Sequence, residues 1–206
     1  MFRRWFSSPA RSETPAPAQS LAVNRRAVCA AYLRGRGVEI GALHVPLAMP
    51  PAVTRLWYLD RFDERRLREH YPELKGKPFA PIGIIADAER ATPIRNESLD
   101  FVAASHFLEH CEDPIGALSE LLRRLKRGGI LYVGIPDKRL TFDAQRPVTP
   151  FDHLVRDHEE GTAWSRQAHY DEWARFVHPP ATDDAIAAKA AALERMNYSI
   201  HFHVWT

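Results

Sequence analysis

Short apolar runs alternate with polar or helix-patterned segments through the middle of the chain. Five of these runs have the length of buried strands and are bounded by turn residues. They are Val38 to Leu43, Leu56 to Leu59, Ile82 to Ala86, Leu99 to Ala104 and Ile130 to Ile135. The intervening segments leave room for crossover connections between neighbouring strands. The pattern therefore predicts an α/β fold with a doubly wound, mostly parallel sheet.

The stretch from Ser98 to Asp137 contains the clearest strand–helix–strand unit. Its helix is expected to begin at Pro114, which suits a first helical turn, and to continue to the Gly128-Gly129 pair. The polar loop from His106 to Asp113 follows the first strand of the unit. Because ligands of open parallel sheets bind beyond the carboxyl ends of the strands, this loop is expected to lie at the binding crevice.

Helical spacing of apolar residues predicts further helices on both sides of this unit. They are expected over Leu21 to Leu33 (ended by Gly35 to Gly37), Asp63 to His70 (capped by Asp63), from about Pro150, Trp164 to Val177, and Thr182 to Met196. HFHV, near the end of the chain, is expected to be a strand-like packing segment whose side chains alternate between two faces, and the alternative is that its two histidines are a ligand pair.

Composition divides the chain into three parts. Residues 1–20 are rich in Pro, Ala and Ser and predict a disordered tail, residues 21–137 form the α/β core, and residues 138–206 form a helical segment of the same domain. Sheets of this kind usually have further strands after the fifth. We therefore expect the final strands to be missing and the chain to be truncated at its C-terminus.

The charge pattern argues against a nucleic-acid partner. The net charge is only +2, and the arginines are scattered among acidic residues. No apolar run approaches the roughly 18 residues of a transmembrane helix. The two cysteines have no metal or redox spacing and no secretory signal is present, so a cytoplasmic location is expected. The sequence leaves the oligomeric state open.

Two motifs, LDFVAASHFLEHCEDPIGAL and LKRGGILYVGIPDKR, resemble the class I S-adenosylmethionine-dependent methyltransferases of the type 11-like group. The downstream FDAQRPVTPFDHLVRDHEEG is similar to a narrower subgroup. The resemblance covers roughly Val38 to Thr206. It implies that the cofactor is S-adenosyl-L-methionine, and that a methyl group passes by in-line displacement to a small-molecule or glycan-type acceptor.

The resemblance places the cofactor at the ends of three strands. Glu39 and Gly41 match the acid-and-glycine loop after the first strand, although Ala42 and Leu43 stand where the family has more glycine. This departure leaves open a shifted cofactor or weaker binding.

The second and third strand ends supply the other implied cofactor contacts. Asp60 matches the acid that binds the ribose hydroxyls, since a carboxylate accepts hydrogen bonds from both. The alternative role for Asp60 is to cap the turn before the next helix. Asp87 matches the acid that meets the adenine amino group, and Ala88 would add backbone contacts.

His106 and His110 are the candidate catalytic residues, because the superfamily places acceptor-side residues after the fourth strand. A hydroxyl acceptor needs a base with a pKa near the working pH, which histidine provides. Glu109 is expected to orient one of the two rings or to cap the next helix. The alternative is that each histidine only hydrogen-bonds to its own turn.

The downstream segment supplies the candidate acceptor-binding residues Arg139, His153, Asp157 and His158. His153 and Asp157 share a helical face, with His158 close by. This set allows a metal site, but a polar wall of the acceptor pocket is the preferred interpretation, and no metal ligand is assigned. Arg139 and Arg146 are expected either to pair with an anionic acceptor or to be solvated on the surface.

Two other functions compete with methyl transfer. The glycine-poor loop and the missing strands favour a non-catalytic methyltransferase-like binding or assembly module. A nicotinamide-dependent oxidoreductase is disfavoured, because its glycine fingerprint is absent.

Overall fold

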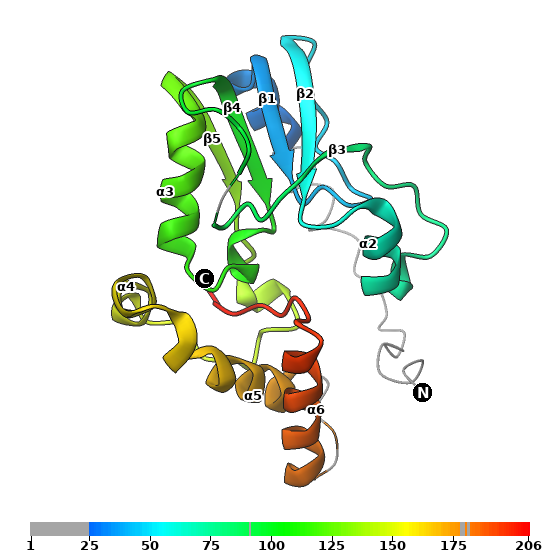
Figure 1. Ribbon diagram of the computed structural model, residues 1–206, viewed down its shortest axis with the longest axis vertical. Coiled ribbons are helices and arrows are strands. Elements are labelled where there is room, and N and C mark those ends of the chain that lie inside the picture. Colours follow the sequence, from blue (N-terminus) through cyan, green and yellow to red (C-terminus); the bar gives the residue numbers. More distant parts are fainter. Residues whose placement is uncertain (1–24, 91, 178–179, 181) are drawn as a thin grey trace.

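Five parallel strands form a single sheet in the computed structural model of the chain (Figure 1). The model describes residues 25–90, 92–177, 180 and 182–206, so the expected tail, residues 1–20, lies outside the described residues. The strand order is β3-β2-β1-β4-β5. The strands are β1 (Gly35–Ile40), β2 (Val53–Asp60), β3 (Ile82–Ile85), β4 (Leu99–Ser105) and β5 (Leu125–Gly134). The predicted doubly wound parallel sheet is confirmed.

Helices connect the strands and continue after the last one. The α-helices are α2 (Glu64–His70), α3 (Pro114–Arg124), α4 (Phe151–Glu160), α5 (Arg166–Phe176) and α6 (Asp183–Arg195), and residues 25–32 are also helical. Short 3-10 helices are Pro72–Leu74, Leu108–His110, Lys138–Leu140 and Thr162–Trp164. The predicted Asp63 cap is confirmed, since Asp63 accepts a hydrogen bond at the start of α2, and Thr182 accepts one at the start of α6.

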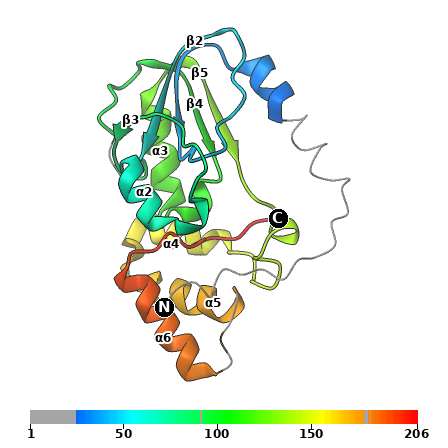
Figure 2. The ribbon, with the colours of Figure 1, turned by 90° about the vertical axis from the view of Figure 1, so that its right-hand side faces the viewer.

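The sheet is covered on both faces, as a parallel sheet requires. Figure 2 shows α3 on one side of the sheet and the helix of residues 25–32 on the other. β4 packs against both layers, because alternate side chains along a strand point to opposite faces of the sheet. Phe101 packs with Cys29, while Val102 and Leu121 belong to the cluster on the α3 side.

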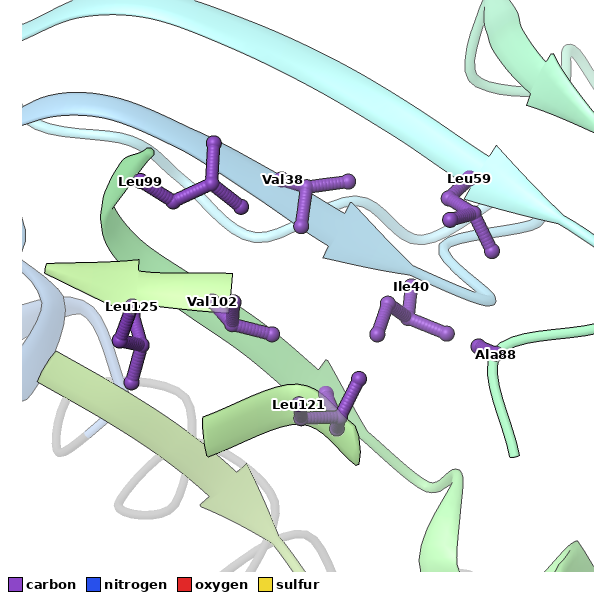
Figure 3. Packing of buried hydrophobic residues seen from close by; sticks show 9 residues of the cluster. Val38, Ile40, Leu59, Ala88, Leu99, Val102, Leu121 and Leu125 are labelled. Atoms are coloured by element: carbon purple, nitrogen blue, oxygen red, sulfur yellow. The ribbon is translucent and has the colours of Figure 1, made fainter. Parts of the chain in front are cut away.

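The cluster on the α3 side is the main apolar core of the sheet (Figure 3). It joins strand residues to one face of α3 and to the segment after β3. Its buried members are Val38, Ile40, Leu59, Ala88, Leu99, Val102, Ala104, Leu121 and Leu125. This packing fixes the carboxyl ends of β1, β2 and β4 relative to one another.

The expected end of the helix after Pro114 was wrong. α3 ends at Arg124, and β5 begins at Leu125 instead of after the glycine pair. The backbone N–H groups of Glu97 and Ser98 donate to the carbonyls of Arg123 and Arg124, which satisfies the last turn of the helix. Leu125 then pairs with Leu99 and packs in the sheet core.

The expectation that Gly35 to Gly37 terminates a helix was also wrong, because these residues open β1. Gly37 has a specific packing reason to lack a side chain. A Cβ atom there would lie 2.3 Å from Cζ of Phe101, which is fully buried. The glycine therefore lets the Phe101 ring pack flat against β1.

The C-terminal third of the chain forms a second apolar core below the sheet. Buried side chains of α5 and α6 pack with Ile200 and Phe202 of the C-terminal segment. This segment, residues 197–206, runs between the sheet and the helices α4 to α6 in Figure 1. The bridge between Asp137 and Trp205 attaches its end to the segment after β5.

The segment HFHV packs in the interior as expected, but it forms none of the described strands. The four residues from His201 to Val204 are all buried. The backbone N–H of Phe202 donates to the Glu109 carbonyl (2.6 Å), and that of Val204 donates to Thr149 Oγ1 (3.0 Å). The segment is buried on every side because it is enclosed between the loop after β4 and the C-terminal helices.

No helix of the described residues has both the length and the apolar character needed to cross a membrane. Cys29 and Cys111 are free thiols, and both are buried.

Candidate active site

A cavity of about 490 Å³ lies beyond the carboxyl ends of the strands. The strand order reverses between β1 and β4, although the strands stay parallel, and this is the switch point at which open α/β sheets bind ligands. The ends of β1 and β2 and the segments that follow β3 and β4 contribute residues to the wall, and residues flanking α2 and the C-terminal segment complete it. The lining residues are Ile40, Gly41, Leu43, Leu59, Asp60, Arg61, Phe62, Tyr71, Ala86, Asp87, Ala88, Glu89, Arg90, His106, Phe107, His110, Cys111, Asn197 and Ser199.

Gly41 turns the chain sharply at the end of β1. Its φ is +64°, and a Cβ atom built there would meet no atom within 4 Å. Its backbone N–H donates to the Leu59 carbonyl (3.0 Å), which keeps the turn against β2. The backbone at Gly41 thus borders open space, as a loop that admits a ligand close to its main chain must.

Glu39 is not on the cavity wall, contrary to the direct cofactor contact that the resemblance implied. Its side chain is buried, and Oε1 accepts a hydrogen bond from the Leu47 backbone N–H (2.8 Å). Burial raises the pKa of its carboxyl to about 7. In this structure Glu39 therefore holds the loop that follows Gly41.

Asp60 closes β2 with its carboxyl on the cavity wall. The residue is 9% exposed, and Oδ1 accepts a hydrogen bond from the Arg61 backbone N–H (2.7 Å). Burial raises the pKa of the carboxyl to about 6. A desolvated carboxylate of this kind gains from hydroxyl donors that enter the cavity.

Asp87 and Ala88 follow β3 and line the same cavity. Asp87 is exposed, and its Oδ1 accepts a hydrogen bond from the Glu89 backbone N–H (3.0 Å). Ala88 is buried in the sheet core. Glu89 is a third acid on this wall: its Oε1 accepts from the Asp113 backbone N–H (2.8 Å), and burial raises its pKa to about 7.

His106 begins the loop after β4 and projects a largely exposed ring. Its Nδ1 lies 3.1 Å from Oε1 of Glu109, which is fully buried. In the tautomer that donates Nδ1–H to this carboxylate, Nε2 keeps a free lone pair. The expected orienting role of Glu109 thus has a geometric basis.

His110 lies deeper and faces the C-terminal segment. Its Nδ1 is 2.9 Å from the Ile200 carbonyl and 3.1 Å from Oγ of Ser199. Burial, and after it the neighbouring His201, lowers the pKa of His110 to about 4. The ring is therefore neutral at pH 7, with Nδ1–H donated to the carbonyl and Nε2 unprotonated.

Backbone strain is concentrated around the cavity. Within the described ranges, four residues other than glycine have positive φ, and three of them line the cavity: Leu43 (46°), His106 (55°) and Asn197 (47°). Left-handed backbone costs non-glycine residues roughly 1–2 kcal/mol each. Leu43 takes this conformation at a position where the resemblance led us to expect glycine. Strained residues of this kind gather at functional sites.

The four expected acceptor-binding residues are not among those that line the cavity. Arg139 is exposed and ion-paired with Asp137 (2.5 Å), and His158 lies against Asp113 on the surface (2.9 Å). His153 and Asp157 are in contact with each other in a separate cluster (3.1 Å).

Arg146 does not reach the cavity or the surface. It is fully buried between Asp143 (2.8 Å) and Glu172 (2.8 Å). Both roles expected for this residue, pairing with an acceptor and solvation on the surface, were therefore wrong. Its guanidinium instead connects the segment before α4 with α5.

Several lining residues were not predicted from the sequence. Phe62 and Tyr71 come from the ends of α2, and Asn197 and Ser199 come from the C-terminal segment. The sequence carries no local signal for the last two, because they reach the cavity only through the packing of α5 and α6.

Two groups of side chains among the described residues are close enough to share a metal ion. One contains His153, Asp157, His169 and His203, and the other contains Glu109, His110 and His201. In the second group the Nδ1 atoms of both histidines already have partners, the Ile200 carbonyl and Oδ2 of Asp143.

Comparisons with known proteins identify the family of the central segment. Residues 45–133 match the family of the methyltransferase domain. This segment contains Asp60, Asp87 and His106, whereas Glu39 and Gly41 precede it. No curated protein matches the chain significantly.

Solved structures with a similar arrangement are methyltransferases or proteins of unassigned activity. A putative methyltransferase from Bacillus halodurans is 18% identical, with a TM-score of 0.46 over 85% of this chain and 68% of that one. A possible histamine N-methyltransferase from Thermotoga maritima is 23% identical, with a TM-score of 0.43 over 82% and 70%. The YcgJ protein from Bacillus subtilis is 22% identical, with a TM-score of 0.42 over 56% and 50%.

The chain thus spans half the length of the YcgJ protein. Similarities this distant carry no information on the acceptor. The family match and the strand order agree on the class of domain. Residues 45–133 are thus similar to the methyltransferase domain family, and the sheet that contains them has a Rossmann-like strand order.

Proposed function

We propose that this chain transfers a methyl group from S-adenosyl-L-methionine to a small-molecule or glycan-type acceptor. The observation that carries the proposal is the convergence of Gly41, Asp60 and Asp87 on one cavity. Each follows a different strand, and the three strands are neighbours in the sheet. The family match supports the same activity.

The residues of the cavity fit the expected cofactor. Open space beside the Gly41 backbone suits the methionine part, and the Asp60 carboxylate suits a pair of ribose hydroxyls. Asp87 is exposed toward solvent and can accept from an adenine amino group. Glu39 would act indirectly, by fixing the loop that holds Gly41 in place.

The bound cofactor would supply a methyl carbon that its positively charged sulfur already activates. The protein then has to align the acceptor with that carbon and exclude water. His106 and His110 border the cavity at the end of β4, opposite the loops after β2 and β3. This position suits residues on the acceptor side.

His106 is our choice for the base that takes a proton from a hydroxyl acceptor. Glu109 holds its Nδ1 side, so that Nε2 is directed away from the carboxylate and can receive the proton. The buried Glu109 carboxylate would stabilise the imidazolium that results. His110 is the second candidate, and its pKa of about 4 favours a hydrogen-bonding role at neutral pH.

The competing proposal is a non-catalytic methyltransferase-like binding or assembly module. Leu43 favours it, because this strained, bulky residue lines the cavity where the family has glycine. Such a module would bind the cofactor without transferring the methyl group.

The test combines calorimetry and an acceptor screen on the full chain. We expect S-adenosylhomocysteine to bind with one site per chain. We also expect radiolabelled methyl groups from S-adenosylmethionine to appear on at least one class in a screen of sugars, glycans and small amines. Neither heat nor a thermal shift with either cofactor form would refute both proposals. Binding without any methyl transfer would favour the non-catalytic module.

A further inference from the structure

Four side chains of the types that bind metal ions lie close together, outside the cavity and outside residues 45–133, the segment that matches the family. We propose that these side chains form a zinc site: His153, Asp157, His169 and His203. They come from α4, α5 and the C-terminal segment. The proposal does not depend on methyl transfer, and it replaces the earlier preference for a polar acceptor wall at His153 and Asp157.

The spacing of the ligand atoms fits a tetrahedral ion. Nε2 of His153 lies 3.1 Å from Nε2 of His169 and 3.1 Å from Oδ2 of Asp157. The His203 ring also approaches this oxygen, with Nε2 3.7 Å from it, and one ligand atom from each of the four residues lies within 4.8 Å of the other three. Zinc bonds of about 2.0–2.1 Å in a tetrahedron place neighbouring ligand atoms about 3.3 Å apart.

Hydrogen bonds within the group leave its atoms unsatisfied. Nε2 of His153 carries at most one proton, so it cannot donate to both His169 and Asp157. Oδ2 of Asp157 accepts no hydrogen bond, although the side chain is fully buried. Nδ1 of His203 is also buried without a partner. A cation among these atoms would satisfy all of them together.

Hydrogen bonds from neighbouring residues orient the ligand atoms, as such hydrogen bonds do in known metal sites. Oγ of Ser165 donates to Oδ1 of Asp157 (2.6 Å), which leaves Oδ2 free. Nε2 of His203 is 3.1 Å from the Glu112 carbonyl, and a proton there keeps Nδ1 as a lone pair. His169 and His203 are both buried, so an ion held by them would be shielded from solvent.

The donor set identifies the kind of ion. Three imidazoles and one carboxylate suit zinc better than Mg²⁺ or Ca²⁺, which prefer oxygen ligands. Four protein ligands complete a tetrahedron and leave no open position, so the site is structural. It would fasten the C-terminal segment to α4 and α5. That segment carries Ser199 and Asn197, which line the cavity.

The first experiment measures metal on the purified full chain. Metal-free protein, prepared with a chelator, is titrated with zinc sulfate and with cobalt chloride. We expect one ion per chain, the visible absorption of tetrahedral Co²⁺, and a melting temperature that rises with zinc. Failure of the wild-type protein to take up either ion would overturn the proposal.

Variants locate the ion. Asp157→Asn and His169→Gln are expected to weaken zinc binding by about tenfold or more. His158→Gln is the matched control, because His158 follows Asp157 on α4 but faces Asp113 instead of the cluster. Binding to Asp157→Asn and His169→Gln that equals binding to His158→Gln means an adventitious ion only, and would refute the site.

Locating the ion in a crystal of the wild-type protein keeps the test decisive if a variant at a buried residue fails to fold. Crystals of the zinc-loaded wild-type protein are measured at the zinc absorption edge. We expect one anomalous peak among the four side chains. A peak at Glu109, His110 and His201, or at the surface, would contradict the proposal.

Discussion

Nδ1 of His110 donates a hydrogen bond to the carbonyl of Ile200 (2.9 Å), which joins two residues 90 positions apart in the chain. Through this bond, the loop after β4 meets the C-terminal segment beside the cavity. Ser199 and Asn197 of that segment line the cavity next to His110. The cavity wall thus depends on the correct packing of α5 and α6, which lie outside the family-matched residues 45–133.

Gly37→Ala is expected to destabilise the fold, because the new Cβ would lie 2.3 Å from the Phe101 ring. Overpacking of a buried contact costs about 1–3 kcal/mol. The measurement is urea unfolding. Gly83→Ala in β3 is the matched control, since a Cβ there meets nothing within 4 Å, and a change within about 0.5 kcal/mol is expected. Equal stability of the two variants would contradict the packing described at β1.

Gly41→Ala is expected to impair cofactor binding as well as stability. The residue has positive φ, so alanine costs roughly 1–2 kcal/mol of folding free energy, and its methyl group would enter the cavity. Gly76→Ala has the same backbone penalty at φ +82° but lies outside the cavity lining. Chemical unfolding is expected to show similar losses for both variants. Calorimetry with S-adenosylhomocysteine is expected to show weaker binding for Gly41→Ala alone.

Asp60→Asn is expected to weaken S-adenosylhomocysteine binding by about 1–3 kcal/mol, because a charge-assisted hydrogen-bond acceptor is lost. This corresponds to roughly 5- to 150-fold in the dissociation constant. Asp100→Asn serves as the control, since Asp100 lies near the start of β4 and pairs with Lys126 (2.6 Å). An unchanged dissociation constant for Asp60→Asn would remove Asp60 from the site.

Cofactor affinity is expected to fall at acidic pH through Asp60. Its pKa in the protein is about 6, and the carboxylate, as the charged form, is the better acceptor for hydroxyl groups. Protonation below pH 6 therefore disfavours binding, by about tenfold at pH 5 if the neutral acid does not bind. Calorimetry between pH 7.5 and 5 on the wild type and Asp60→Asn checks this. The same slope in both proteins would assign the effect to another group, such as Glu89.

His106→Ala is expected to abolish methyl transfer to a hydroxyl acceptor while leaving S-adenosylhomocysteine binding within about threefold of wild type. The reason is that His106 is the proposed base and is not one of the strand-end acids proposed to bind the cofactor. Glu109→Gln is expected to lower the turnover number less than His106→Ala does, because Glu109 acts through the histidine. Full activity of His106→Ala would transfer the role to His110.

The sequence predicted the sheet well because its strands are short apolar runs with distinct ends. The resemblance to methyltransferases pointed to the strand-end acids Asp60 and Asp87, and both line the cavity. The end of α3 was missed because backbone hydrogen bonds from Glu97 and Ser98 terminate it, ahead of the glycine pair. Local patterns carry no information about such a long-range contact.

The acceptor side was harder to predict for the same reason. His153 and Asp157 were grouped correctly by helical spacing, but His158 turns to Asp113 and the partners of the pair are His169 and His203. Only the packing of α5 and the C-terminal segment brings these residues together. Arg146 was misjudged because its partners, Asp143 and Glu172, enclose it within the C-terminal third of the chain.

A crystal structure of the complex with S-adenosylhomocysteine tests the central claim most directly. We predict that the ligand lies in the cavity beyond β1, β2 and β3, with its ribose hydroxyls hydrogen-bonded to Asp60 and its amino-acid part beside Gly41. A ligand bound elsewhere, or one in the cavity that leaves both residues without contact, would contradict the account.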